Sequence, residues 1–439
     1  MNRFAFGFAL LCSASLGTHA KDLHIFKKNQ LTDKFWCEGA TFGDFNRDGR
    51  MDIVSGPFWY EGPDFTKHHQ IYPATTTTFA RKKPDGSMET IAGFEGALGV
   101  ENKYSDNFFA FTYDFNHDGW DDILVIGFPG EATVWYENPR GQECDWPKHL
   151  VLDTTDNESP TFTDLTGDGK PELVCASKGA YGYAEPDWKE PTKPWTFHPI
   201  TPNKHYERFT HGMGVGDVNG DGRMDLIEKD GWWEHPPSLA GEPLWKFHPY
   251  AFTPNSHGGA QMYAYDVNGD GLNDVVTSFA AHGFGLVWYE QTRTNGDIGF
   301  IQHIILSPEQ KRVPNEYGVS FSELHAVALV DVDGDGLKDI VTGKRFWSHG
   351  RTGDPDRNSS AVLYWFKLIR GKNHIASFVP YLIDDDSGVG TQLVVAPCSN
   401  KKRPDIVVGN KKGTYYFQHL VAKVSEAEWE QHQPKLIPQ

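Results

Sequence analysis

The residues best placed to do chemistry are acids and amides that recur at fixed spacing in short loops. In residues 216–227, Asp217, Asn219, Asp221 and Asp225 occupy the first, third, fifth and ninth loop positions. Gly222 between them permits a sharp turn. Side-chain oxygens at this spacing are typical ligands of a hard cation. The pattern therefore predicts a calcium-binding loop.

Five further loops of the same kind begin at residues 44, 114, 164, 266 and 331. Their expected ligands are Asp44, Asn46, Asp48, Asp52, Asp114, Asn116, Asp118, Asp122, Asp164, Thr166, Asp168, Glu172, Asp266, Asn268, Asp270, Asp274, Asp331, Asp333, Asp335 and Asp339. A seventh copy at residues 402–408 keeps the apolar segment that follows each loop but has lost the loop ligands. We therefore expect up to six structural Ca²⁺ ions.

The elements around these loops are strands rather than helices. Each ninth-position acid runs directly into a pair of apolar, mostly β-branched residues, such as Ile53-Val54 and Val275-Val276. An EF-hand needs a helix on each side and a Glu at the twelfth position, so that motif is excluded. Loops spaced roughly 50 to 70 residues apart and joined by short strands are typical of propeller blades. We expect an all-β, seven-bladed β-propeller over residues 21–425 and a C-terminal tail over 426–439.

In this register, the loops resemble the FG-GAP, or VCBS, repeats of integrin-α-like propellers, over nearly all of the chain after residue 35. The resemblance implies the propeller fold and calcium binding. It implies little about function, because one fold can carry many unrelated sites.

The N-terminus predicts export. Residues 1–20 contain Arg3, an apolar run over 4–16 and a plausible cleavage site with the small residues Thr18 and Ala20, the pattern of a cleaved signal peptide. We therefore expect a secreted or periplasmic protein, and no later apolar stretch is long enough to span a membrane. Residues 21–26 alternate polar with apolar side chains, which suggests a strand that completes the last blade.

Charge and cysteines add little about partners. The formal net charge is −18, and six divalent ions would offset twelve of these charges. No basic groove or nucleic-acid module is present, so we expect no nucleic-acid partner. Cys37 and Cys398 belong to blades that must meet, but they differ in register by roughly 20 Å, so no disulfide is predicted between them.

A second repeated motif places histidines beside aromatic and acidic residues. Trp-Tyr-Glu or a related triplet is followed by a short segment that contains a histidine. The histidines are His69, His149, His198, His248 and His303. A residue needed once for catalysis would not recur in five blades, so we interpret these as packing residues of the outer strands.

Non-repeated residues are expected at the opposite end of the strands from the loops. Counting six residues back from each first loop Asp gives Glu38, Phe108, Glu158, His211, Ala260 and His325, and His257 lies three residues before Ala260. Three imidazoles and two carboxylates at the channel mouth would suit zinc or another divalent metal with an open position. The alternative is a set of unrelated strand-end side chains.

The segments around this mouth are rich in functional groups. The segments that enter the inner strands include 101–107, 205–211, 255–257 and 315–318. The loops that leave the second strands add Lys178, Lys229, Asp230, His282, Lys344, Arg345 and His349. Such groups suit a hydroxyl-rich ligand such as a sugar, although surface loops are commonly polar without one.

Two functions fit these observations. In the first, a metal held by His211, His325 and His257 polarises a substrate oxygen, while Tyr206, Tyr317 or a nearby histidine moves a proton, and Arg208 lies in the segment of Tyr206. This would suit a carbon–oxygen lyase, namely a sugar dehydratase or polysaccharide lyase. The chain also resembles the propeller portion of aldos-2-ulose dehydratase and, more loosely, propeller-fold polysaccharide lyases, but it ends before that family's cupin domains. In the second, the propeller is a non-catalytic platform that binds a glycan or a protein.

Overall fold

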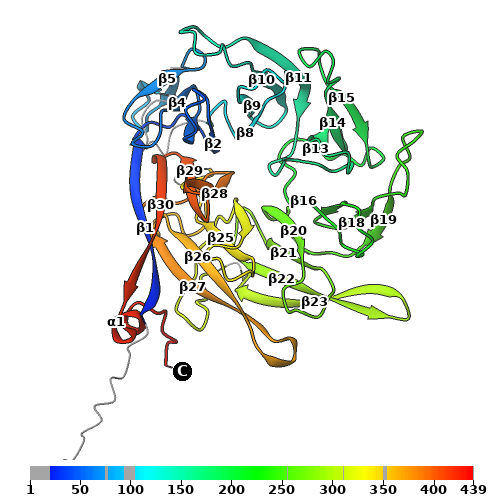
Figure 1. Cartoon of the computed structure of the whole chain (residues 1–439), viewed down its shortest axis with the longest axis vertical. Helices are drawn as coiled ribbons and strands as arrows, with labels where there is room; N and C mark the ends of the chain where they lie inside the picture. Colours follow the sequence, from blue (N-terminus) through cyan, green and yellow to red (C-terminus); the bar gives the residue numbers. More distant parts are fainter. Residues whose placement is uncertain are drawn as a thin grey trace, which may run out of the picture.

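The structure is a computed structural model that describes residues 20–74, 78–92, 104–254, 256–309, 311–349 and 353–438. Nearly all regular elements in these ranges are β-strands, arranged as sheets around a common axis (Figure 1). The predicted signal peptide lies almost entirely outside the described residues, as do residues 101–103 and 255 of the expected mouth segments. No helix of the described part is long and apolar enough to cross a bilayer.

Four sheets are simple meanders whose strands follow chain order. They comprise β2 (Ala40–Gly43), β3 (Asp52–Ser55), β4 (Phe58–Tyr60) and β5 (His68–Gln70); β8 (Phe109–Tyr113), β9 (Asp122–Ile126), β10 (Glu131–Tyr136) and β11 (Lys148–Thr155); β12 (Thr161–Thr163), β13 (Glu172–Ser177), β14 (Ala180–Glu185) and β15 (Thr196–Pro199); and β24 (Val327–Val330), β25 (Asp339–Gly343), β26 (Leu363–Arg370) and β27 (Ala376–Asp384). Each calcium-type loop joins the first two strands of its meander, as the sequence predicts.

The last sheet combines both ends of the chain. Its strands are β28 (Leu393–Asn400), β29 (Arg403–Asn410), β30 (Gly413–Val424) and β1 (Lys21–Thr32), in the order β1-β30-β29-β28. The alternating N-terminal segment thus forms the outer strand, antiparallel to β30, in agreement with the prediction. Apolar residues of β3 and β29 share one buried cluster, so this sheet packs against the first one and closes the ring.

The predicted count of seven separate blades is wrong for the described residues, because five four-stranded sheets stand apart and the other propeller strands form one eight-stranded sheet. That sheet contains β16 (Met213–Gly216), β17 (Asp225–Glu228), β18 (Gly231–Glu234), β19 (Lys246–Pro249), β20 (Gln261–Tyr265), β21 (Asp274–Ser278), β22 (Leu286–Thr294) and β23 (Asp297–Leu306). β16 and β20 pair in parallel at Gly214 and Met262. A Cβ on Gly214 would lie 1.7 Å from the Met262 carbonyl oxygen, so this glycine permits the close approach.

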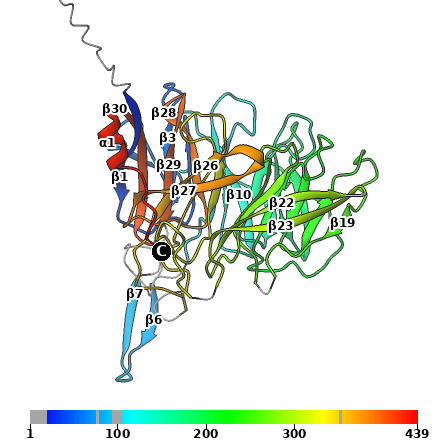
Figure 2. The same ribbon diagram turned by 90° about the horizontal axis from the view of Figure 1, so that it is seen from below.

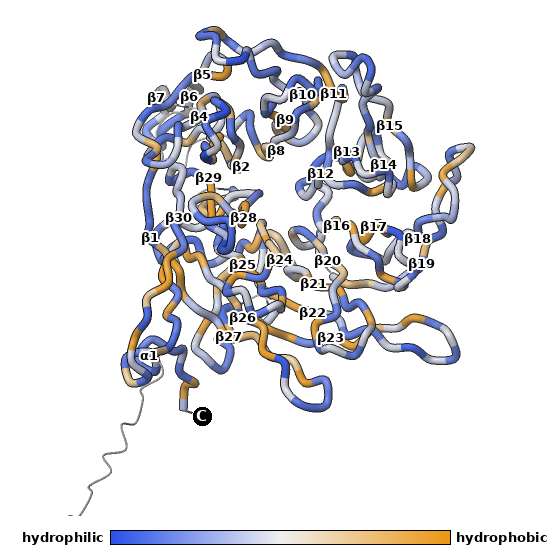
Figure 3. The backbone as a smooth tube through the Cα atoms, in the orientation of Figure 1, coloured by the Kyte–Doolittle hydropathy of each residue, from blue (hydrophilic) through white to orange (hydrophobic). Residues whose placement is uncertain are grey.

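Two smaller elements lie outside the sheets of the ring. The hairpin β6 (Thr78–Lys82) and β7 (Met88–Ala92) projects from one face of the molecule (Figure 2). Helix α1 (Glu426–Gln431) follows β30, and Lys372–His374 form a 3₁₀ turn. Figure 3 shows hydrophilic stretches mainly in turns and peripheral loops, whereas the apolar stretches lie mainly on strands.

The repeated aromatic and histidine residues pack as predicted. The His248 ring stacks on Trp232 with centroids 4.0 Å apart and planes 5° apart, and His303 stacks on Trp288 at 4.2 Å and 11°. Each histidine also contacts the Glu of its own triplet, as His303 does with Glu290 at 2.7 Å. These pairs cover the outer strands and belong to the repeat.

Candidate functional site

The acidic loops are shaped by their own side chains. The carboxylate of Asp217 accepts backbone N–H bonds from Gly220, Asp221 and Gly222 at 2.7 to 3.1 Å. Gly222 adopts a positive φ of 86°, so a side chain there would be strained. The corresponding Asp44, Asp114, Asp266 and Asp331 each accept N–H bonds of the same kind. The loop conformation is therefore preorganised.

The ninth-position acid has a structural role in most copies, whereas the hydrogen bonds of Glu172 in the third copy stay within the loop, at Leu165 and Thr166. Asp274 is fully buried, and its two oxygens accept the N–H groups of Val267 in the loop and Gln291 in β22, both at 2.8 Å. Asp405 in the degenerate seventh copy does the same with Ser399 (2.5 Å) and His419 (2.7 Å). The carboxylate thus connects the loop to the third strand even where the other loop ligands are absent.

Two of the loops also bring candidate metal ligands close together. One oxygen from each of Asp164, Asp168 and Glu172 lies within 4.8 Å of the others, and so do those of Asp331, Asp333 and Asp339. Burial raises the pKa of Asp274 and of Asp339 to about 7, and backbone hydrogen bonds oppose that shift only partly. A bound cation would favour the ionised form of these acids.

The opposite ends of the same strands bring three imidazoles together. One ring nitrogen from each of His211, His282 and His325 lies within 4.8 Å of the others. His211 precedes β16, His325 precedes β24, and His282 lies in the loop after β21. The ring centroids of His282 and His325 are 4.3 Å apart, and those of His211 and His282 are 4.7 Å apart. These three residues define the histidine cluster.

Backbone hydrogen bonds between neighbouring segments position the cluster. The N–H of Glu323 donates to the carbonyl of Gly283 (2.7 Å), which brings the His282 loop beside the segment that carries His325. The N–H of Glu158 donates to the carbonyl of Thr210 (2.9 Å), which places Glu158 beside His211. The side chains of His211 and His325 are almost fully buried, whereas His282 is 30% exposed, so solvent reaches the cluster from the His282 side.

Hydrogen bonds at the other ring nitrogens orient two of the imidazoles. His211 Nδ1 donates to the Phe209 carbonyl at 2.6 Å, so Nε2 carries the lone pair when this ring is neutral. His325 Nδ1 faces Ser348 Oγ at 3.5 Å and Glu323 Oε2 at 3.7 Å. His211 Nε2, His325 Nε2 and His282 Nδ1 are buried and have no hydrogen-bond partner among the described residues. Unpaired buried nitrogens that converge on one place are what a metal-binding site requires.

The protonation states fit the same interpretation. Burial first, and then the neighbouring His211, lower the pKa of His282 to about 2. Burial lowers the pKa of His325 well below its usual value. Both rings are therefore neutral at physiological pH, which is the form that binds metals.

A buried arginine crosses the axis beside the cluster. Arg345, from the loop after β25, forms an ion pair with Glu38 and lies 3.5 Å from Glu158 Oε2. All three side chains are nearly inaccessible to solvent. Burial alone would raise the pKa of Glu158, but His211 and Arg345 lower it to about 2. Glu38, expected as a metal ligand, is thus occupied by arginine, whereas Glu158 Oε2 is also 3.5 Å from His211 Nε2 and stays near the cluster.

A histidine–aspartate pair lies at the exposed side of the cluster. His349 Nδ1 is 3.0 Å from Asp354 Oδ1, and this contact raises the pKa of His349. The His349 ring lies 4.4 Å from that of His282, centroid to centroid, and its side chain is 44% exposed. It is therefore placed to exchange protons with a ligand or with solvent.

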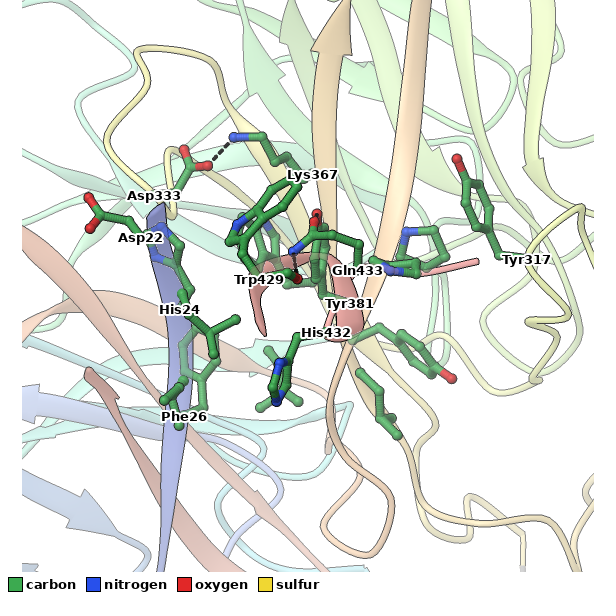
Figure 4. A pocket seen from close by; sticks show the side chains of 18 of the residues that line it. Asp22, His24, Phe26, Tyr317, Asp333, Lys367, Tyr381, Trp429, His432 and Gln433 are labelled. Atoms are coloured by element: carbon green, nitrogen blue, oxygen red, sulfur yellow. Dashed lines mark hydrogen bonds and ion pairs between the residues drawn. The ribbon is translucent and has the colours of Figure 1, made fainter. Parts of the chain in front are cut away.

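Four other predicted catalytic residues lie outside the cluster. His257 is exposed and makes no part of it, because the chain turns at Gly258 (φ 110°) before it reaches the inner strand. The Tyr206 hydroxyl is buried and donates to Glu228 at 3.0 Å. Arg208 is exposed and lies 3.7 Å from Glu131. Tyr317 lines a groove between β1, β27 and the C-terminal segment (Figure 4).

The expected positions Phe108 and Ala260 are buried in apolar clusters.

Sequence reasoning missed Glu323 and Asp354 and did not assign His282, Arg345 or His349 to the metal site. It also missed Lys411, which is buried after β29 and donates to the Trp347 carbonyl at 2.8 Å, and whose pKa burial lowers to about 8. His282, Arg345 and Lys411 share one signal, since all lie in loops that leave a second strand.

Comparison with family models matches the FG-GAP-like repeat at residues 114–175 and 266–342. No curated protein matches the sequence. Among solved structures, a lectin from Agrocybe aegerita that recognises non-reducing terminal N-acetylglucosamine aligns at 16% identity with a TM-score of 0.43, covering 88% of this chain and 85% of the lectin. A rhamnogalacturonan lyase from Bacillus licheniformis aligns at 11% identity with a TM-score of 0.37, covering 90% and 72%. Rhamnogalacturonan lyase YesW aligns at 11% and 0.38, with the same coverage. The chain therefore carries FG-GAP-like repeats in a β-propeller.

Proposed function

We propose that the histidine cluster binds zinc or another divalent transition metal and that the protein uses this site to act on a carbohydrate by elimination or dehydration. The observation that carries the proposal is the convergence of His211, His282 and His325. Their buried ring nitrogens make no hydrogen bond among the described residues, although Glu158 Oε2 lies 3.5 Å from His211 Nε2 and Glu323 Oε2 lies 3.8 Å from His282 Nδ1. Three imidazoles are a common ligand set of metal sites that keep one position open for substrate or water.

The chain's own residues divide the remaining tasks. A bound metal would supply Lewis acidity toward a substrate carbonyl or hydroxyl oxygen. Glu158 lies beside His211 and balances charge at the buried side. The exposed His349, held by Asp354, is placed to take a proton from carbon or to give one to a leaving oxygen. In an elimination, a C–H and a C–O bond break, a C=C bond forms, and the leaving oxygen receives a proton.

A second candidate is a propeller that binds a glycan or a protein without turnover. The observation in its favour is the groove of Figure 4, of about 860 Å³, which is lined by Phe26, Tyr317, Tyr381 and Trp429 together with polar residues. Aromatic faces beside hydrogen-bonding groups are typical of small-molecule binding sites. This groove lies outside the histidine cluster, so the two candidates depend on different residues.

The test compares His282→Ala with His257→Ala, a matched exposed histidine outside the cluster. We expect metal analysis of the purified protein to find one transition metal, and expect His282→Ala to reduce its affinity at least tenfold. Turnover of polysaccharides, followed by the ultraviolet absorbance of the new double bond, should be lost in His282→Ala and kept in His257→Ala. A protein that carries no transition metal after incubation with zinc would contradict the metal site. Metal binding without turnover, with glycan binding retained in both variants, would favour the binding platform.

The calcium loops and export belong to the same proposal. Up to six Ca²⁺ ions would stabilise the rim of acidic loops, and the preorganised Asp217 type of loop supports this assignment. The N-terminal sequence pattern supports secretion. We also propose to count the eight-stranded sheet as two repeats, because β16–β19 and β20–β23 are each meanders with their own acidic loop. That count gives seven repeats in the ring.

A further inference from the structure

The repeats of this chain serve as an internal comparison for the outer strands. In five blades a glutamate ends the aromatic triplet; these residues are Glu61, Glu137, Glu185, Glu234 and Glu290. Two of them reach their own acidic loop. Asn116 Nδ2 donates to Glu137 Oε1 at 3.2 Å, and Asn268 Nδ2 donates to Glu290 Oε1 at 3.3 Å. The third loop position and the outer-strand glutamate thus form a contact pair.

Both members of this pair differ in the sixth copy. Lys367 follows Trp365-Phe366 where the other blades have glutamate, and Asp333 stands at the third loop position in place of Asn or Thr. In the other blades a neutral loop residue stands opposite a negative glutamate. In the sixth copy a negative aspartate stands opposite a positive lysine. They occur together, which indicates that the two positions are physically coupled in this blade as they are in the two blades with the Asn116–Glu137 and Asn268–Glu290 contacts.

The ammonium of Lys367 lies between the acids of the sixth loop. Nζ bonds to Asp333 Oδ2, as drawn in Figure 4, and to Asp335 Oδ2 at 2.7 Å. These are the third and fifth loop positions, whose oxygens would otherwise face a metal ion. The Lys367 side chain is 23% exposed, so the contact is partly shielded from solvent.

Cations near other loops make a different contact. Among the described residues, Arg50, Arg140 and Arg223 each pair with the fifth-position acid of a loop and with no other loop acid, and Arg370 lies 3.9 Å from the first-position Asp266. Arg50 and Arg140 are 58% and 57% exposed. A contact to the fifth-position acid alone, from the solvent side, leaves the third-position oxygen free to face an ion. Lys367 differs because it engages both.

We propose that the Lys367 ammonium is the built-in cation of the sixth loop and takes the place that Ca²⁺ occupies in the other loops. The inference rests on the proposed calcium binding of those loops. A tethered ammonium is present at a high effective concentration and donates up to three hydrogen bonds, so it competes with a dissolved ion. The sixth loop then keeps its shape without calcium. This blade also supplies His325 to the histidine cluster and Arg345 to the ion pair beside it, so the order of these residues does not depend on calcium supply.

The test exchanges the pairs between two blades of the full-length protein. D333N/K367E gives the sixth loop the Asn–Glu pair of the fifth, and N268D/E290K gives the fifth loop the Asp–Lys pair of the sixth. Calcium per chain is measured by equilibrium dialysis, with circular dichroism to verify folding. We expect one more ion in D333N/K367E than in the wild type and one fewer in N268D/E290K.

Single substitutions keep the inference falsifiable if an exchange variant does not fold. D270A should lower the calcium content by one ion, whereas D335A should leave it unchanged. An equal loss of one ion in both variants would overturn the inference while leaving calcium binding intact. A wild type that binds no calcium at all would overturn the calcium assignment itself, and this inference with it.

Discussion

The two ends of the propeller strands differ in how their contacts are distributed. At one end, the acidic loops repeat the same contacts in successive blades, and even the degenerate seventh copy keeps its Asp405 bonds. At the other end, each contact occurs once, as for Arg345 with Glu38 and Glu158, or for His211 with His282 and His325. Loss of one repeated contact should therefore weaken one blade, whereas loss of a single-copy contact should affect the whole ring.

The largest effect is expected from Arg345→Met. Glu38 and Glu158 would remain buried without their cation, which should lower the free energy of unfolding by about 3–5 kcal/mol. Denaturant unfolding followed by fluorescence measures the loss. Arg208→Met is the matched control, because Arg208 is exposed and its change should stay below about 0.5 kcal/mol. If Arg345→Met lowered the free energy of unfolding by less than about 1 kcal/mol, the proposed difference between the two ends of the propeller strands would be wrong.

A smaller effect is expected at the ninth loop position. Asp405→Ala removes the acceptor of the buried His419 N–H and of the N–H of the exposed Ser399, and should cost about 1–3 kcal/mol whether or not calcium is present. Asp274→Ala removes the same contacts in an intact loop, so its cost should be larger in calcium than in chelator. Thermal unfolding in both conditions separates the two variants. Equal calcium dependence in both would mean that the ninth-position acid serves only the backbone.

The contrast between the two ends of the strands also explains which features could be predicted from the sequence. The loops, the strands after them and the stacked histidines follow a repeat, so their positions could be read by comparing one copy with the next. His211, His325 and Glu158 were found by counting back from the loops, because the inner strands have nearly constant length. In the fifth blade the same count gave Ala260, and His257, chosen three residues earlier, is exposed and lies outside the cluster, next to the turn at Gly258.

Contacts across the axis could not be predicted in this way. Arg345 meets Glu38 and Glu158 from blades far away in the sequence, and no period relates these three positions. His282 was recognised as part of a loop at this rim, but its distance to His325 depends on the hydrogen bond between Glu323 and Gly283. The joined sheet depends on the approach of Gly214 to Met262, which a repeat length does not reveal.

The stability of the sheet in which β1 pairs with β30 should depend on pH. His419 Nδ1 donates to the Pro404 carbonyl (3.2 Å), so its Nε2 accepts from His24 Nδ1 (2.9 Å) in the neutral pair. Burial, and then His24, lowers the pKa of His419 to about 4, below the unfolded value of about 6.5. Protonation therefore favours the unfolded chain. The contribution of neutral His419 to the free energy of unfolding is fully present above about pH 6.5 and is lost as the pH falls toward 4. Its magnitude is about 2 kcal/mol.

The measurement compares urea unfolding of the wild type and His419→Gln at several pH values, because buried carboxyls also titrate and only the difference isolates His419. The wild type should lose its advantage over the variant between about pH 6.5 and pH 4. Parallel stability curves for the two proteins would exclude a role of the His24–His419 bond in acid sensitivity. Because this bond joins β1 to β30 only once in the chain, it behaves as a single-copy contact within a repeated sheet.

The smallest effect is expected from one of the repeated outer histidines. His303→Ala removes a ring that stacks on Trp288 and pairs with Glu290, but His303 and Glu290 are 39% and 29% exposed, so the loss should be about 1 kcal/mol or less. His69→Ala should cost a similar amount, and the double variant the sum of the two, because the blades share no contact at these positions. Differential scanning calorimetry can resolve such differences in one buffer. A double variant that loses much more than the sum would show coupling around the ring, and the repeated contacts would then act together as the single-copy contacts do.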